Sequence, residues 1–144
     1  MLRLVDAAQA LADLTEISSQ VVQVAIIDAD DGLVASTFEP PARAASFVEA
    51  VARLVAEADA AGAVRGLPGL AQLEAATLEG SVFVVRDPGG RTIAATTRPD
   101  PTVGLVFYDL KHCLRSLAEP EPETEPVSAP AAPRRRKTAA DGAA

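Results

Sequence analysis

Four carboxylates in one short stretch are the first side chains that could do chemistry, because clustered carboxylates bind calcium. They are Asp28, Asp30, Asp31 and Glu39. Glu39 falls at the twelfth position counted from Asp28, where a calcium loop places its last ligand. Such a loop also needs a glycine at its sixth position, but Leu33 stands there and Gly32 comes one residue early. We therefore predict a solvated hairpin turn and no metal site.

Two further candidates for chemistry are the lone histidine with the lone cysteine and a pair of glycines. His112 and Cys113 are adjacent in a predicted helix, so their side chains point about 100° apart and do not face each other. We predict a surface histidine and a partly buried cysteine. Gly89 and Gly90 lie between two predicted strands and not before a helix, so they predict a turn and no phosphate loop. With no acid–base pair, activated nucleophile or metal set, we predict that the protein is not an enzyme and has no cofactor.

The net charge and the N-terminal sequence limit the classes of binding partner and the cellular location that we expect. The chain has 144 residues, enough for one domain, and a formal net charge of −7. A negative charge argues against nucleic-acid binding, which needs a basic surface to displace counterions. The N-terminus reaches Asp6 before a signal-peptide apolar region develops, and no window approaches the length of a membrane span. We expect a cytoplasmic protein without stable membrane insertion.

The elements that would carry these residues begin with a helix and a hairpin. Apolar residues three or four apart over residues 4–17 predict an amphipathic helix. Residues 21–27 form a β-branched run that is too apolar for an exposed edge, so we predict an interior strand there. The acidic turn at residues 30–32 leads to a returning strand at residues 33–38.

A long second helix is predicted from Pro40–Pro41 to about Ala61, with Gly62 as its C-terminal stop. Its bulky apolar residues share one broad arc, and its charged residues form a narrow stripe. Between the two lies a third strip of small residues, Ala45, Ala52 and Ala56. A helix with one partner needs only one apolar arc, so the alanine strip predicts contact with a second helix.

The remaining periodic segments predict a three-stranded meander and a last helix. Residues 70–78, 81–86 and 91–97 predict the strands, and residues 102–117 predict the helix. The element order of helix, two strands, helix, three strands and helix predicts an α+β domain with a single five-stranded antiparallel sheet. After residue 118, a Glu/Pro-Ala stretch with a basic run at residues 134–137 buries too little apolar surface to fold. We predict one domain over residues 1–118 and a disordered tail over residues 119–144.

Two segments in this order resemble the roadblock/dynein light-chain family, a longin-like fold. Residues 24–35 (Val-Ala-Ile-Ile-Asp-Ala-Asp-Asp-Gly-Leu-Val-Ala) are similar to the family's first hairpin. Residues 101–110 (Pro-Thr-Val-Gly-Leu-Val-Phe-Tyr-Asp-Leu) are similar to the entry into its last helix, although Val103 stands where leucine is common. The resemblance covers about residues 4–117, and the acidic, proline-rich tail is an addition to the family's pattern.

The resemblance implies a homodimer in which the middle helices pack together and the third strands join into one sheet. In bacteria such dimers accompany Ras-like small GTPases and influence their nucleotide cycle or localisation, so the family implies a non-catalytic GTPase regulator. The helix contact would use the alanine strip. The predicted third strand contains no internal proline or lysine that would blunt an exposed edge, and its contact residues would be Gln72, Leu73, Glu74, Ala75 and Ala76.

Three points stay open in the sequence. Arg86, Arg91 and Arg98 surround the last two strands and are candidates for a docking face. The same elements would also allow a heterodimer with a related domain in place of the homodimer. Two other functions fit the same elements: a ligand-sensing domain of the PAS or GAF kind, and a scaffold whose dimer displays two tails. The shortage of aromatic residues argues against ligand sensing.

Overall fold

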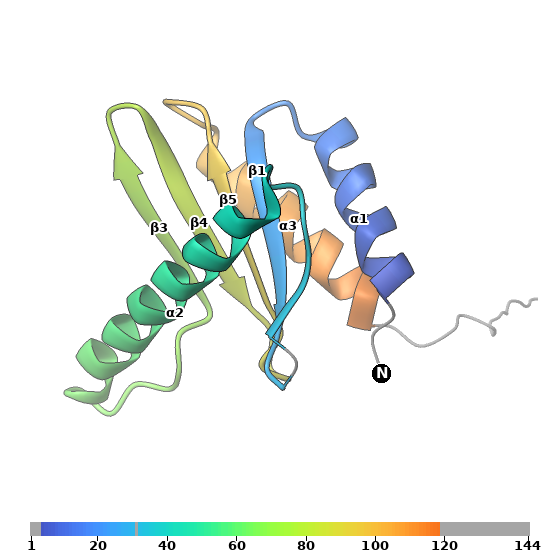
Figure 1. Cartoon of the computed structure of the whole chain (residues 1–144). Helices are drawn as coiled ribbons and strands as arrows, with labels where there is room; N and C mark the ends of the chain where they lie inside the picture. The colour runs from blue at the N-terminus through green and yellow to red at the C-terminus, as the bar shows by residue number, and fades with distance from the viewer. Residues whose placement is uncertain (1–3, 31, 119–144) are drawn as a thin grey trace, which may run out of the picture.

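A five-stranded antiparallel sheet lies between one helix on one face and two helices on the other (Figure 1). The computed structural model describes residues 4–30 and 32–118. Its elements are α1 (Leu4–Ile17), β1 (Val21–Asp28), β2 (Gly32–Ser36), α2 (Pro41–Ala63), β3 (Gln72–Thr77), β4 (Gly80–Arg86), β5 (Thr92–Thr97) and α3 (Val103–Ala118). This is the predicted element order, so the predicted fold class is confirmed.

The sheet has the strand order β2-β1-β5-β4-β3. The meander of β3, β4 and β5 is therefore confirmed, and β1 joins it by pairing with β5. Ala94 of β5 lies opposite Ala25 of β1 on one side and opposite Val84 of β4 on the other. The strand predicted to be interior, β1, is flanked by β2 and β5. At the two edges of the sheet lie β2 and β3.

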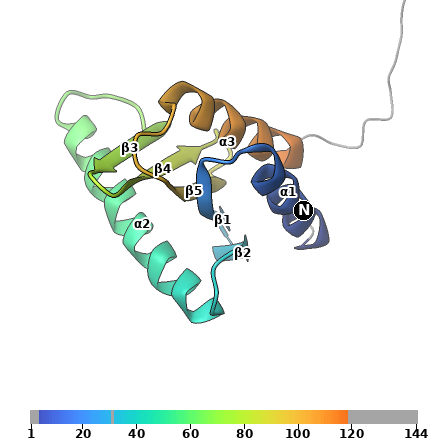
Figure 2. The ribbon, with the colours of Figure 1, turned by 90° about the horizontal axis from the view of Figure 1, so that it is seen from above.

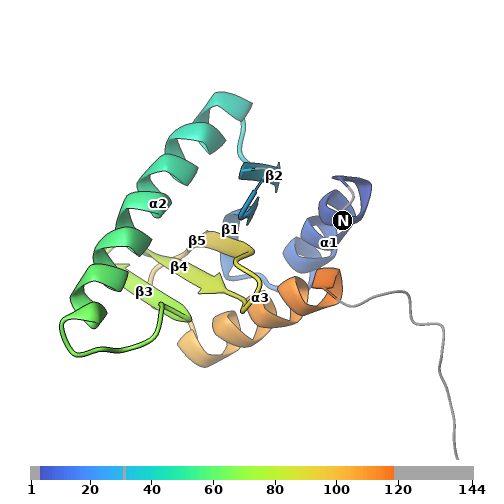
Figure 3. The same cartoon turned by 90° about the horizontal axis from the view of Figure 1, so that it is seen from below.

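Figures 2 and 3 show the two helical layers on opposite faces of the sheet. Alternation of side chains along the strands divides the core between these layers. On the side of α1 and α3, the sheet contributes Ile26, Phe83 and Ile93, which are fully buried against both helices. On the opposite side, Val51 of α2 packs against Val84 and Ala94. The larger cluster lies under α1 and α3.

The end of α2 differs from the prediction. Gly62 lies inside the helix, and the chain leaves the helix at Gly66, which has φ of 71°. The Leu67 N–H donates to the Gly62 carbonyl and the Gly66 N–H donates to the Ala63 carbonyl. These two bonds close a helix end of the Schellman type, which requires a left-handed residue that glycine supplies without strain. Gly62 as the stop is therefore wrong, because only Gly66 adopts that conformation.

Three predicted strands are shorter than expected. The structure gives Gln72–Thr77, Gly32–Ser36 and Thr92–Thr97 where residues 70–78, 33–38 and 91–97 were predicted. Leu78 is 96% exposed in the turn to β4, so apolar character alone did not mark the strand end. The predicted tail, residues 119–144, lies outside the described residues. No helix in the described part of the chain combines the length and apolar character that a membrane crossing requires.

Candidate interaction surfaces

The open edge of β3 is the first surface that could bind another chain. On its inner side β3 pairs with β4 through every residue from Gln72 to Thr77. The Arg86 N–H donates to the Ala71 carbonyl, which identifies residues 71 and 86 as a hydrogen-bonded pair. In an antiparallel ladder such pairs alternate, so the N–H groups of Gln72, Glu74 and Ala76 point away from β4. An added strand could therefore pair with these three residues.

The second surface is the outer part of α2. Of its 23 residues, only Ala44 and Val51 are buried. Ala45, Ala52 and Ala56 of the predicted strip are all exposed. Ala52 and Ala56 border a cavity of about 420 Å³ between α2 and the sheet end formed by Gly32, Gly90 and their neighbours.

The opposite flank of α2 carries further apolar residues outside the alanine strip. Ala50 is exposed and Leu54 is half-buried, and both border a separate shallow hollow on the helix. At about 100° per residue, Ala50 and Ala52 face nearly opposite directions around the helix axis. Both flanks are therefore available to a partner helix.

A network of hydrogen bonds fixes the end of α2 next to β3. Arg86 Nη2 lies 2.9 Å from Asp59 Oδ1 and 3.1 Å from Oδ2, and Arg86 Nε donates to the Leu70 carbonyl at 2.9 Å. The Leu70 N–H donates to Asp59 Oδ1 at 2.6 Å. The hydrogen bonds from Arg86 and Leu70 lower the pKa of Asp59 below its usual value. This network ties the α2–β3 loop to β4.

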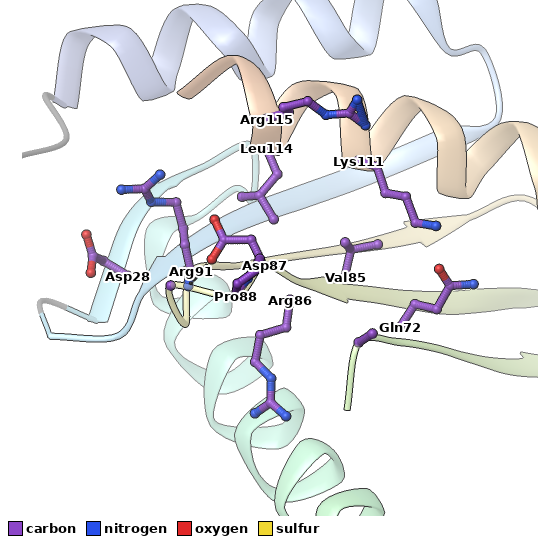
Figure 4. A pocket seen from close by; sticks show the side chains of 12 residues that line it. Asp28, Gln72, Val85, Arg86, Asp87, Pro88, Arg91, Lys111, Leu114 and Arg115 are labelled. Carbon is purple, nitrogen blue, oxygen red and sulfur yellow. Dashed lines mark hydrogen bonds between the residues drawn. The ribbon is translucent and has the colours of Figure 1, made fainter. Parts of the chain in front are cut away.

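A pocket with basic walls lies on the other face of the sheet, between α3 and the β4–β5 turn (Figure 4). Its volume is about 580 Å³. Lys111 and Arg115 line it from α3, and Arg91 lines it from the start of β5. Val85 and Leu114 supply an apolar floor. We call this cavity the basic pocket.

The cations of the basic pocket form no ion pairs within the part of the chain that the structure describes. None of Arg91, Lys111 and Arg115 forms an ion pair with any residue in the ranges 4–30 and 32–118. The Nε atom of Arg91 is buried and has no hydrogen-bond partner among those residues. Three cations without ion pairs thus line one pocket, together with the carboxylates of Asp28 and Asp87, in a chain whose net charge is −7.

The structure separates the three arginines that were predicted as a docking face. Arg86 and Arg91 lie at the same end of the sheet, but the Arg86 side chain turns toward α2 and is held by Asp59 (Figure 4). Arg98 follows the other end of β5, where its Nε donates to the Ser19 carbonyl at 3.1 Å. Arg86, Arg91 and Arg98 therefore do not form one cluster.

Lys111 and Arg115 of the basic pocket were missed as site residues. Their spacing of four in a predicted helix placed them on one face, which was a usable signal. The local sequence pattern did not show that Lys111 and Arg115 line the same pocket as Arg91. This is because α3 and the β4–β5 turn come together only when both pack on the sheet.

The other chemical candidates lie apart from these surfaces. Cys113 is buried in the core under α1 and α3, and His112 is exposed, as predicted. Burial raises the pKa of the Cys113 thiol to about 11, with a smaller contribution from Asp13. Within the described residues, no three His, Cys, Asp or Glu side chains gather where they could hold a metal ion. Asp28 instead accepts a hydrogen bond from the Asp30 N–H in the hairpin turn.

Comparison with solved structures identifies the fold. A roadblock/LC7 domain from Streptomyces avermitilis superposes with a TM-score of 0.69 at 13% identity, covering 77% of this chain and 93% of that one. MglB from Myxococcus xanthus superposes with a TM-score of 0.67 at 14% identity, covering 82% of this chain and 94% of that one. The gliding protein MglB from Thermus thermophilus gives a TM-score of 0.67 at 15% identity, with coverages of 80% and 87%.

These likenesses confirm the roadblock-type identification at the level of the fold. Searches with protein-family models and against curated proteins find no match to the sequence.

Proposed function

We propose that this roadblock-fold protein is a cytoplasmic, non-catalytic homodimer that binds a Ras-like small GTPase and modulates its nucleotide cycle or localisation. The observation that carries the proposal is the open β3 edge beside an α2 helix whose outer face has no partner within the described chain. The β3 edge exposes backbone N–H and C=O groups, and α2 exposes small apolar side chains. A second copy of the chain could pair with the edge and pack against the helix. Residues 1–118 form the adaptor domain in this proposal, and residues 119–144 form its tail.

The dimer would join two β3 strands through Gln72, Leu73, Glu74, Ala75 and Ala76. The outward N–H and C=O groups of Gln72, Glu74 and Ala76 would pair across the symmetry axis, because an unpaired strand edge accepts a further strand. The alanine strip of α2, Ala45, Ala52 and Ala56, would then contact the α2 helix of the second copy. Small side chains allow two helix backbones to approach closely.

The GTPase partner is supported by the fold and by the two sequence segments that resemble roadblock proteins, residues 24–35 and 101–110. A non-catalytic role agrees with the location of Cys113, whose thiol is buried and held in its neutral form. The protein would act by docking and not through a reaction of its own.

Capture from a lysate of the source organism tests the GTPase assignment. The full-length protein is immobilised and exposed to the lysate with either GDP or a slowly hydrolysed GTP analogue, and bound proteins are identified by mass spectrometry. We expect a small GTPase whose recovery depends on the nucleotide. Its purified form should then bind the purified bait with the same preference. Absence of any GTPase with both nucleotides would contradict the proposal.

The same assay locates the docking face. Arg91 and Arg98 lie at opposite ends of β5, so a compact partner that contacts one end leaves the other free. We therefore compare Arg91→Ala with Arg98→Ala as baits. Loss of capture with one variant alone identifies the docked end, whereas unchanged capture with both would exclude these arginines from the contact.

A further inference from the structure

The basic pocket contains three cations without acidic partners in the described chain, Arg91, Lys111 and Arg115. Two carboxylates also line the pocket, and each already accepts a hydrogen bond from a nearby backbone N–H. Asp87 Oδ1 lies 3.0 Å from the Arg91 nitrogen, and Asp28 Oδ1 lies 3.2 Å from the Asp30 nitrogen. Both acids keep their negative charge, but within the described residues neither forms an ion pair with Arg91, Lys111 or Arg115. The pocket therefore has the chemistry to receive carboxylates from elsewhere.

We propose that the basic pocket binds the acidic segment that follows α3 in the same chain, residues 119–125. This segment has a glutamate at every second position: Glu119, Glu121, Glu123 and Glu125. The pocket and the segment are complementary in charge, since arginine and lysine donors match carboxylate acceptors.

The position of the segment along the chain favours this contact. Arg115 lies in the last turn of α3, and the helix ends at Ala118. Pro120 and Pro122 cannot occupy the interior of a continued helix, and Pro120 also disfavours helical backbone at Glu119. In this proposal the acidic segment would leave α3 next to Arg115 and turn back along the helix.

The length of the segment also suffices. Lys111 and Ala118 are about 10 Å apart along the helix axis at 1.5 Å per residue. Seven residues in an extended polyproline-type conformation span about 22 Å at 3.1 Å per residue. The segment is therefore long enough to run back along α3 past Arg115 and Lys111.

Tethering makes this contact effective even though two of its cations are exposed. Exposed ion pairs between separate molecules are weak. A short flexible connection, however, gives a tethered segment an effective concentration in the millimolar range. The basic pocket is a different surface from the β3 edge, and the proposed contact does not depend on a GTPase partner.

A spin label tests the contact in the full-length protein. Thr124→Cys places the label in the acidic segment, and Cys113 does not compete for it because its thiol is buried with a pKa of about 11. We expect strong broadening of the Gly89, Gly90 and Arg91 amide signals at low salt and its loss at about 1 M salt, where the Debye length is near 3 Å. Absence of broadening at low salt would overturn the proposal.

Charge variants give the matched controls. In the labelled protein, the double variant Lys111→Gln/Arg115→Gln should abolish most of the broadening, and replacing the four glutamates with glutamine should do the same. Replacing Arg134, Arg135, Arg136 and Lys137 with glutamine should leave it unchanged. Because Lys111 and Arg115 are exposed, the double variant is expected to fold. Broadening that persists in the double variant would overturn the assignment of the pocket.

Two further measurements distinguish the same-chain segment from two other occupants of the pocket, a second copy of the chain and small anions. In a mixture of spin-labelled chains and separately isotope-labelled chains, broadening would show that the segment reaches another copy, which would overturn the same-chain contact. Inorganic phosphate at low ionic strength should compete and reduce the broadening if the segment occupies the pocket. Phosphate-induced shifts of the pocket amides without any broadening by the label would instead assign the pocket to small anions.

Discussion

Arg86 and Asp59 join the end of β4 to the last turns of α2 through a pair of hydrogen bonds of 2.9 and 3.1 Å. Asp59 also accepts the Leu70 N–H, so one carboxylate holds both the helix end and the loop that leads into β3. The adjacent Gly69 leaves room for the arginine, since a Cβ at this position would lie 2.9 Å from Arg86 Nη2. The proposed dimer surfaces, α2 and the β3 edge, are thereby held in a fixed relation.

Asp59→Asn should lower the thermal midpoint at neutral pH, because the amide keeps the shape but loses the charge that pairs with Arg86. The pKa of Asp59 is lower in the folded protein than its ordinary value of 3.8. The pair therefore adds stability above the unfolded-state pKa and loses it as pH falls through the folded value, below about pH 4. Thermal unfolding followed by circular dichroism from pH 2 to pH 7 measures this difference.

The control for that series is Glu57→Gln, an exposed carboxylate on the same helix. It should change the midpoint little at any pH. Equal midpoints for Asp59→Asn and the wild type at neutral pH would show that the Arg86–Asp59 pair contributes nothing to folding.

Ala52→Glu should shift the protein from dimer to monomer, because it would place an unpaired carboxylate in the proposed helix contact. Ala50→Glu is the matched variant, since it introduces the same charge on the opposite flank of the same helix. We expect Ala52→Glu to weaken association at least tenfold and Ala50→Glu to leave it near the wild-type value. Sedimentation equilibrium over a concentration series measures both. The reverse result would assign the contact to the flank of Ala50 and Leu54.

Glu74→Pro should also favour the monomer, because it removes an N–H that points outward from the β3 edge while sparing the ladder to β4. Glu74→Ala removes the same side chain but keeps the N–H, so it should still dimerise. Size-exclusion chromatography with light scattering gives the mass of each variant, and far-UV circular dichroism checks the fold. A folded Glu74→Pro variant that stays dimeric would contradict pairing through β3.

Cys113 should resist alkylation in the native protein. With a pKa of about 11, its thiolate fraction at pH 8 is on the order of one in a thousand, and its burial in the core blocks access as well. We expect iodoacetamide to react at least a hundredfold faster in about 6 M guanidinium chloride than in buffer, as measured by mass spectrometry. Rapid native labelling would show that the α1–α3 core opens readily.

Several features of the fold could be predicted from local patterns. The period of apolar residues predicted all eight elements in their order, because each helix or strand must turn its apolar side to the core. The interior place of β1 followed from its apolar run. The three alanines of the strip on α2 are exposed, and their contact with a second helix stays a prediction. The helix end at Gly66 was missed because two nearby glycines carry the same local signal, and only the backbone conformation distinguishes them.

The order of the elements, their apolar faces and at least partial burial of Cys113 all follow from the amino-acid pattern alone. The assembled fold was needed to show that β1 pairs with β5 and that Asp59 reaches Arg86. It was also needed to show that Arg91 lies with Lys111 and Arg115, while Arg98 lies at the other end of β5. This is because periodicity reports the environment of each residue along its own element. Which distant elements meet depends on the packing of whole helices and strands, and that packing brings the cations of the basic pocket together.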